Sequence, residues 1–344
     1  MKELIADIDS WLAAGETAIA LATVIAAWGS APRRAGAKMA FTAGGAAIAG
    51  SVSGGCVEGV VIEAGEAVLA TGRPQLLHFG VADETAWGVG LACGGEIDVF
   101  VERLDPATYA LARQWALTDT PGTIVTVVGG PDELLGRRLA VGPDSVTGSL
   151  GVGLDAEVVA PARQARRPGG HVLPDGVELF IDALRPAPAL IIVGGAHIAV
   201  TLARLARLLG YRTVVIDPRR AFGSAARFPD VDRLIQAWPD KALAEWPLGA
   251  DAAVVTLSHD PKIDDPALRA ALNSAAFYIG ALGSRRTHAA RRARLAAMGF
   301  SDEQLDRIHA PVGLDIAADN PEEIALAIMA EVVMVYRGKM NVGD

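Results

Sequence analysis

The chain has 344 residues, 51% hydrophobic and 21% charged, a composition typical of a folded globular protein of roughly two domains. Its formal net charge of −9, from 31 Lys and Arg against 40 Asp and Glu, argues against general binding to nucleic acid or to an anionic membrane surface. Two cysteines are too few for a disulfide framework, and no apolar run approaches the ~20 residues of a membrane-spanning helix. The sequence also has no secretory signal pattern, so we expect a cytoplasmic protein without integral membrane contact.

The first half of the sequence predicts a mixture of helices and strands. Apolar residues at three- and four-residue spacing predict a helix over Lys2–Ala14, which Gly15 ends. The run Thr17–Trp28, rich in Ala, Val and Ile, has the character of a strand, and a helix is expected after the glycine-rich stretch 50–58, reaching Leu69. Further strands are predicted over 96–102, 122–128 and 177–184, and the stretch Pro161–Gly170 is predicted to be a surface loop.

The proline-rich stretch Arg185–Pro188 marks a domain boundary, because prolines lack the backbone donor that regular structure needs. Beyond it, strands over Ala189–Val193, Thr213–Ile216, Ala252–Leu257 and Phe277–Leu282 alternate with helices over Ile198–Leu209, Leu268–Leu272, Thr287–Met298 and Pro321–Tyr336. Such alternation predicts a mostly parallel sheet with helices on its faces. We therefore expect an α/β protein with an N-terminal mixed α/β domain over 1–185, a proline-rich linker over 186–189, and a Rossmann-like parallel-sheet domain over 190–344.

The second domain opens with a buried strand that runs into the turn Gly194-Gly195-Ala196-His197 and then into a helix. Asp217 ends the next strand, 23 residues after Gly194. In a dinucleotide site the glycines let the backbone approach a pyrophosphate and the acid accepts ribose hydroxyls. Ala196 stands where the second glycine of that fingerprint is expected. Two interpretations stay open: this turn binds NAD(P) or another nucleotide, with His197 beside it, or the Rossmann topology persists without one.

Two later loops also follow predicted strands, where α/β sheets build their ligand crevices. The pair His259-Asp260 can orient a ligand or relay a proton, and it can equally cap the following turn. Ser284 and Arg285 open a helix and offer a hydroxyl and a guanidinium that suit a phosphate. The alternative for the arginines of this helix, over 291–294, is a solvated face that contacts an acidic partner.

Cys56 is the side chain best suited to soft-metal or sulfur chemistry. It follows Gly54 and Gly55 in a loop that is predicted to lead into a helix, and the positive end of a helix favours the thiolate. The alternative is a buried structural thiol. Glu58 could polarise this site or complement the helix dipole. Cys93 is also flanked by glycines and could meet Cys56 in space or pack in the core, and the spacing of the two cysteines argues against a zinc site.

A collinear set of motifs resembles the xanthine dehydrogenase accessory family (XdhC/CoxI). The matching segments, in chain order, are Trp28–Arg33, Gly36–Met39, Gly50–Glu58, Cys93–Ile97, Gly194–His197, Ser258–Asp260, Tyr278–Gly280, Gly283–Arg286, His309–Ile316 and Pro321–Glu323. They extend over nearly the whole chain. The sequence departs from the family at Ala196 in the glycine loop, at Ser258 where Thr is usual, and at Ala317 where Gly commonly follows.

The resemblance implies a chaperone that binds molybdenum cofactor, as molybdopterin or its cytidine dinucleotide form, and helps to load the sulfurated cofactor into a xanthine dehydrogenase or carbon monoxide dehydrogenase-like hydroxylase. It assigns Cys56 to cofactor binding and metal ligation. The partner it implies is the molybdenum hydroxylase apoenzyme; a cysteine desulfurase and a second copy of the chain are further candidate partners. Arg33 and Lys38 would add positive charge near an anionic pterin, with surface solvation as the alternative.

Two other functions stay open on the sequence alone. An NAD(P)-dependent oxidoreductase is favoured by the glycine loop and Asp217, but Ala196 and the lack of a recognisable acid–base set for catalysis argue against it. A scaffold protein with a vestigial Rossmann domain is the third interpretation.

Overall fold

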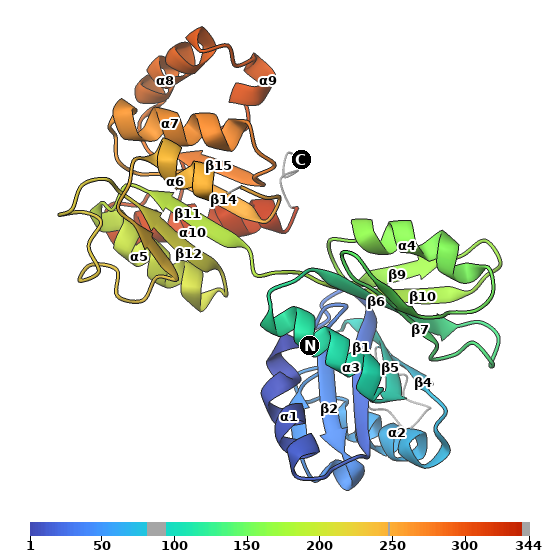
Figure 1. The fold of residues 1–344 in the computed structure, drawn as a ribbon. Coiled ribbons are helices and arrows are strands. Elements are labelled where there is room, and N and C mark those ends of the chain that lie inside the picture. Colours follow the sequence, from blue (N-terminus) through green and yellow to red (C-terminus); the bar gives the residue numbers. More distant parts are fainter. Residues whose placement is uncertain (81–93, 247, 339–344) are drawn as a thin grey trace. The chain divides into compact units, whose positions relative to one another are not determined.

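A computed structural model describes residues 1–80, 94–246 and 248–338 and divides the chain into two compact units, Met1–Pro186 (unit 1) and Ala187–Asp344 (unit 2) (Figure 1). Unit 1 mixes helices with antiparallel sheets and unit 2 is built on a parallel sheet, which confirms the predicted fold class. The two units are described separately below.

Unit 1 contains two five-stranded antiparallel sheets in the part of the chain that the structure describes. The first has the strand order β3-β2-β1-β5-β4, with β1 Ile19–Trp28, β2 Lys38–Thr42, β3 Ile48–Gly50, β4 Gln75–Phe79 and β5 Glu96–Arg103. The second has the order β8-β7-β6-β10-β9, with β6 Gly122–Gly129, β7 Arg138–Val141, β8 Val146–Gly148, β9 Gly169–Val172 and β10 Glu178–Leu184. The helices are η1 Lys2–Leu4, α1 Ile5–Ala13, η2 Ala43–Gly45, α2 Glu58–Thr71, α3 Pro106–Leu117 and α4 Leu154–Gln164.

The two sheets pack face to face, with α2 on the outer side of the first sheet and α4 on the outer side of the second (Figure 1). Side chains alternate between the two faces of every strand, so each sheet turns one set of side chains to the other sheet and one set to a helix. Ile25 and Phe100 from the first sheet pack against Val128 and Phe180 from the second. The opposite face of the first sheet packs against α2, and the opposite face of the second sheet packs against α4. Unit 1 is therefore layered as helix, sheet, sheet, helix.

Two ion pairs, one buried and one partly buried, cross from one sheet to the other. Lys38 Nζ on β2 lies 3.0 Å from Asp182 Oδ2 on β10, and Arg138 Nη2 on β7 lies 2.5 Å from Glu102 Oε2 on β5. These four side chains line a small cavity of about 40 Å³ between the sheets. Burial raises the pKa of Glu102, although Arg138 opposes that shift. Lys38, which the sequence suggested as positive charge near a bound pterin, is instead 3% exposed and used inside the fold.

Unit 2 has a six-stranded sheet of order β13-β12-β11-β14-β15-β16 in which every pairing is parallel. Its strands are β11 Ala189–Val193, β12 Arg212–Ile216, β13 Arg233–Ile235, β14 Ala252–Thr256, β15 Tyr278–Ala281 and β16 Ile308–His309. Its helices are α5 His197–Leu208, α6 Pro239–Glu245, α7 Pro261–Leu272, α8 Arg285–Ala297, α9 Asp302–Leu305 and α10 Pro321–Tyr336. Helices α5 and α10 cover one face, and α6, α7 and α8 cover the other (Figure 1). This is the strand order of a doubly wound nucleotide-binding fold.

Prolines inside helices made two predictions wrong. The first four residues of the predicted loop Pro161–Gly170 belong to α4, and its last two residues begin β9. Helix α7 begins at Pro261 rather than at Leu268, and contains Pro266. A proline in a helix removes one hydrogen bond, but both helices bury apolar side chains against their sheets, and this packing outweighs the local preference.

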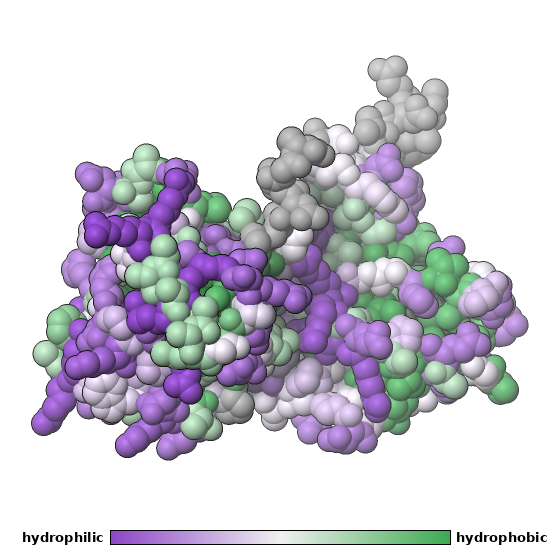
Figure 2. All heavy atoms as spheres, turned by 90° about the horizontal axis from the view of Figure 1, so that it is seen from above, coloured by the Kyte–Doolittle hydropathy of each residue, from purple (hydrophilic) through white to green (hydrophobic). Residues whose placement is uncertain are grey.

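Within the described residues, no helix is both long and apolar enough to cross a membrane. On the face seen in Figure 2, hydrophilic side chains are interspersed with hydrophobic ones.

Candidate functional site

Three of the sequence motifs place residues in or against one hydrophobic cluster of the first sheet. The end of β1 pairs with the start of β5, Trp28 opposite Glu96, so the turn after Trp28 lies beside the segment before Glu96. The two are in close contact, because a Cβ on Gly95 would come within 2.3 Å of the Ala31 backbone nitrogen. Val57, in the loop that carries Cys56, belongs to the hydrophobic cluster against which Ala31 packs. The turn after Trp28 and the segment before Glu96 are thus in contact, and the Cys56 loop shares their hydrophobic cluster.

The loop between β3 and α2 is folded around the side chain of Glu58. Its carboxylate accepts seven hydrogen bonds: from Ser51 Oγ, Val52 N, Ser53 N, Ser53 Oγ, Gly54 N, Gly55 N and Val57 N, at 2.6 to 3.3 Å. Burial raises the pKa of Glu58, but the hydrogen bonds from Ser53 and Ser51 outweigh it and lower the pKa to about 2. Glu58 therefore positions the loop, a role that the sequence did not predict.

Cys56 is exposed at the tip of this loop, two residues before α2 begins. Its backbone N–H donates to Ser53 Oγ at 2.9 Å. Gly54 and Gly55 have φ angles of 85° and 123°, which side-chain-bearing residues rarely adopt. Among the described residues, no heavy atom would lie within 4 Å of a Cβ on either glycine, so the loop is open beside Gly54 and Gly55. The structure places Cys56 as an accessible thiol on a well-tied loop.

The second cysteine of the prediction, Cys93, lies outside the described residues. Among the residues that are described, no group of three or more His, Cys, Asp and Glu side chains could hold a metal ion.

In unit 2, the predicted glycine loop and the Ser258-His259-Asp260 loop meet at the topological switch point. Strands β11 and β14 are neighbours, but β12 and β15 lie on opposite sides of them. Gly194, after β11, is so close to the loop after β14 that an added Cβ would lie 2.8 Å from the Ser258 nitrogen. Ligands of doubly wound folds bind in the crevice at this point.

Asp217 does not present a free carboxylate to this crevice. It is fully buried and accepts a hydrogen bond from Gly195 N at 2.7 Å. Its two carboxylate oxygens also accept from Nε and Nη2 of Arg219, at 2.9 and 2.7 Å. Burial raises the pKa of Asp217, but the Arg219 and Gly195 hydrogen bonds lower it overall. A Cβ on Gly195 would lie 2.4 Å from the carbonyl oxygen of Phe222. The glycine and the acid are thus occupied by the chain's own residues rather than left for a ribose or a pyrophosphate.

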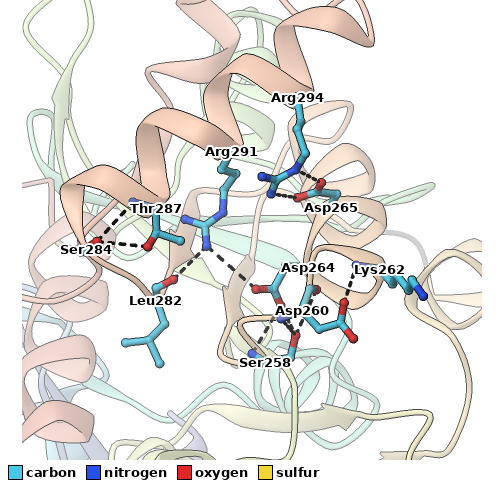
Figure 3. Close-up of polar contacts among 10 residues, drawn as sticks. All are labelled: Ser258, Asp260, Lys262, Asp264, Asp265, Leu282, Ser284, Thr287, Arg291 and Arg294. Atoms are coloured by element: carbon cyan, nitrogen blue, oxygen red, sulfur yellow. Dashed lines mark hydrogen bonds and ion pairs between the residues drawn. The ribbon is translucent and has the colours of Figure 1, made fainter.

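The remaining predicted residues of these loops differ in exposure and in role. Asp260 caps α7 through a 2.9 Å bond from Lys262 N (Figure 3), which is the capping role that the sequence left open. His259 is exposed and adopts a left-handed conformation with φ of 60°. His197 opens α5, is 75% exposed, and lies 3.8 Å from Glu322 Oε1.

Ser284 and Arg285 lie at the start of α8, after β15. Ser284 Oγ caps the helix by accepting from Thr287 N at 3.2 Å (Figure 3). Arg285 is exposed. Arg285 is therefore an accessible cation at a helix start, as phosphate binding requires.

Arg291, on α8, does not belong to the solvated face that was the alternative. Arg291 is 2% exposed, donates to the Leu282 carbonyl at 2.8 Å, and lies 3.9 Å from Asp264 Oδ2 (Figure 3). Asp264 accepts in turn from Ser258 Oγ at 2.6 Å. Burial raises the pKa of Asp264 and lowers that of Arg291. This chain of contacts joins α8, α7 and the loop after β14, and the sequence did not predict the contact between Arg291 and Asp264.

Comparisons with known proteins agree along the chain. Residues 190–332 match the XdhC Rossmann domain, and residues 11–80 match the XdhC and CoxI family. The chain is 30% identical over 335 residues to a Bacillus subtilis (strain 168) protein whose name describes a probable xanthine dehydrogenase subunit, with 96% of each chain covered. It is 29% identical over 325 residues to the molybdenum cofactor insertion chaperone PaoD of Escherichia coli (strain K12), covering 94% of this chain and 85% of that protein. The crystal structure of a xanthine dehydrogenase from Bacillus halodurans has a similar fold, with a TM-score of 0.72 and 25% identity over 99% of this chain and 97% of that one.

Replacing Glu58 by Gln is expected to lower the free energy of unfolding by about 1–3 kcal/mol. The NH₂ group of the new amide would face N–H groups whose hydrogen bonds are now accepted by a carboxylate oxygen, so those donors would lose their partner. Glu63→Gln, an exposed change on the same helix, is the control and should leave stability unchanged. Urea unfolding followed by circular dichroism measures both.

The stabilisation by Glu58 should also depend on pH. Since the pKa of Glu58 in the folded state is about 2, its contribution to the free energy of unfolding should be fully present above pH 4.5 and lost as the pH falls through 2. Equal stabilities of the two variants would contradict the organising role of Glu58.

Proposed function

The chain belongs to the XdhC and CoxI family, and on that premise we propose that it binds molybdenum cofactor and delivers it, in sulfurated form, to a molybdenum hydroxylase apoenzyme. A relative aligned over 94% of this chain carries the name of a molybdenum cofactor insertion chaperone, which supports an accessory role connected with this cofactor. The specific client, the sulfuration step and the participation of a cysteine desulfurase are parts of the proposal.

The observation that carries the proposal is the exposed thiol of Cys56 on a loop tied down by Glu58. Thiolates bind soft transition metals, and the cofactor brings its own dithiolene ligands, so one protein sulfur can complete such a site without a protein metal cluster. The seven donors around Glu58 fix the loop in place, and the open space beside Gly54 and Gly55 gives a bulky ligand access to the thiol. Cys93 is a second candidate for the same role.

For the phosphate-containing part of the cofactor, we propose Ser284 and Arg285 of unit 2. A helix start with an exposed guanidinium can form charge-assisted hydrogen bonds to phosphate oxygens. The glycine loop Gly194–His197 and the His259-Asp260 pair flank the switch-point crevice and remain candidates for contacts to the same group.

An NAD(P)-dependent oxidoreductase is the weaker alternative. The acid that would accept ribose hydroxyls, Asp217, is buried and paired with Arg219, and the Phe222 carbonyl occupies the space beside Gly195. The side chains needed to hold the nucleotide are therefore engaged elsewhere, and we assign no hydride transfer to this chain.

Cys56→Ala is expected to retain the fold and to lose most of the bound cofactor, because the proposed metal ligand is removed. The protein would be purified from a host that makes molybdenum cofactor, and its molybdenum and pterin contents measured. Cys56→Ser, which keeps the size of the side chain, should lose the cofactor as well. Equal pterin content in the wild type and both variants would contradict the assignment.

Arg285→Ala is expected to weaken binding of the phosphorylated cofactor roughly 10- to 150-fold, the loss of a charge-assisted contact typically worth ~1.5–3 kcal/mol. Arg286→Ala, the exposed arginine next in the chain, is the matched control. Titration of the apoprotein measures both affinities. If the two variants bind equally well, Arg285 has no specific part in binding phosphate.

Deletion of the gene tests the chaperone function directly. The client hydroxylase should then be present and folded but deficient in sulfurated molybdenum centre, and adding the protein back with a cofactor source should restore its activity. Full client activity in the deletion strain, together with steady NAD(P)H oxidation by the isolated protein, would favour the oxidoreductase instead.

A further inference from the structure

The motif that begins at His309 has no part in the function proposed above, yet it is one of the most tightly bonded regions of unit 2. His309 ends β16, and its backbone pairs with Gly280 of β15. Its side chain reaches Glu331 on α10, which also holds Gly313 of the loop that follows β16 and Tyr278 at the start of β15. Four separate segments therefore meet at one carboxylate.

The hydrogen bonds at Glu331 determine where the protons lie. Oε2 lies 2.5 Å from the Tyr278 hydroxyl and 2.7 Å from the Gly313 nitrogen, and Oε1 lies 2.9 Å from His309 Nδ1. Burial raises the pKa of Glu331, but the bonds from His309, Tyr278 and Gly313 lower it overall, so the carboxylate is ionised and can only accept. Burial and the nearby Glu331 raise the pKa of Tyr278, so the phenol keeps its proton.

His309 Nδ1 must therefore carry a hydrogen and donate it to Glu331. In a neutral imidazole the other nitrogen, Nε2, then bears a lone pair. The Tyr278 ring stacks on the imidazole at a centroid distance of 4.6 Å and an interplanar angle of 27°, which holds the ring in one plane. The result is a hydrogen-bond acceptor with a fixed tautomer and a fixed direction.

Nε2 itself has no hydrogen-bond partner among the described residues, while the side chain keeps 17% of its surface exposed. Since all strands of this sheet are parallel, the end of β16 lies at the same edge as the loops that begin at Gly194, Ser258 and Leu282. An oriented acceptor is thus present at the edge of the sheet where doubly wound folds bind ligands, and no described residue donates to it.

We propose that His309 Nε2 accepts a hydrogen bond from an exocyclic amino group on the heterocycle of the ligand bound in unit 2. This rests on the proposed cofactor role of that unit. A phosphate at neutral pH chiefly accepts hydrogen bonds, so it suits the N–H donors of Arg285 rather than a lone pair. An amino group, which both a pterin and a cytosine carry, is the complementary partner. Glu331 and Tyr278 are positioning residues that keep the lone pair on Nε2.

Two substitutions separate this role from a structural one. In His309→Asn the amide N–H takes the place of Nδ1–H and can still bond to Glu331, but nothing replaces Nε2. In Glu331→Gln the amide oxygen can accept from Tyr278 and Gly313, which turns its NH₂ group towards His309. Nδ1 must then accept, and the proton moves to Nε2.

Nitrogen-15 NMR of histidine-labelled full-length protein reads the tautomer without any ligand. The wild type should show a protonated Nδ1 and an unprotonated Nε2 for His309, and Glu331→Gln should show the reverse. A wild-type His309 with its hydrogen on Nε2 would overturn the proposal, and so would a tautomer that is unchanged in Glu331→Gln.

Ligand titrations test the contact itself with two pairs of compounds. Pterin is compared with lumazine, and cytidine monophosphate with uridine monophosphate; in each pair the second compound has an oxo group in place of the amino group. The wild type should prefer the amino member of at least one pair by about 2- to 12-fold, and that pair identifies the heterocycle. His309→Asn should lose the preference while its unfolding curve and its affinity for inorganic phosphate stay unchanged. A preference that survives in His309→Asn, or no preference in the wild type, would refute the contact. Failure of the cofactor role alone would appear differently, as an intact amino preference in a protein that purifies without pterin.

Discussion

The ionised carboxylate of Glu58 determines what the first candidate site can do. By taking five backbone N–H groups and two hydroxyls of its own loop, it removes the donors that a glycine-rich loop at a helix start would otherwise offer to an anion. What remains on the surface is a thiol with open space beside two glycines. This loop therefore presents a thiol at its surface, while its backbone donors are taken up by Glu58.

A similar internal use of polar groups governs the Rossmann crevice of unit 2. Asp217 bonds to Gly195 and Arg219, and the neighbouring glycines are needed for close contacts with Ser258 and Phe222. A strand, a glycine turn and an acid at the right spacing therefore give the topology of a nucleotide site in which Asp217 is already paired. The functional groups left at this edge are exposed ones further along the sheet.

Local patterns predicted the parts of the molecule that depend on local chemistry. The buried β-strands of unit 2, their alternation with helices and the loops at the carboxyl edge follow from periodicity and from the positions of glycines. Interactions between distant segments could not be predicted in this way: Lys38 pairs with Asp182 across two sheets, Arg291 is drawn inward by Asp264, and Pro161 lies inside a helix held by its buried face. Glu58 was recognised as part of a motif, but its role depends on the path of the loop around it.

The crossed ion pairs between the two sheets of unit 1 have an evolutionary consequence. Each sheet contributes one cation and one anion, so the first sheet's Lys38 and Glu102 are matched only by the second sheet's Asp182 and Arg138. Losing either member of a pair leaves an unpaired charge in a nearly dry seam, which is far more destabilising than losing the pair together. A substitution at one member of a pair is therefore expected to be accompanied by a substitution at its partner in the other sheet. In a chimaera that takes one sheet from a distant relative, both residues of each ion pair would have to come from the same protein.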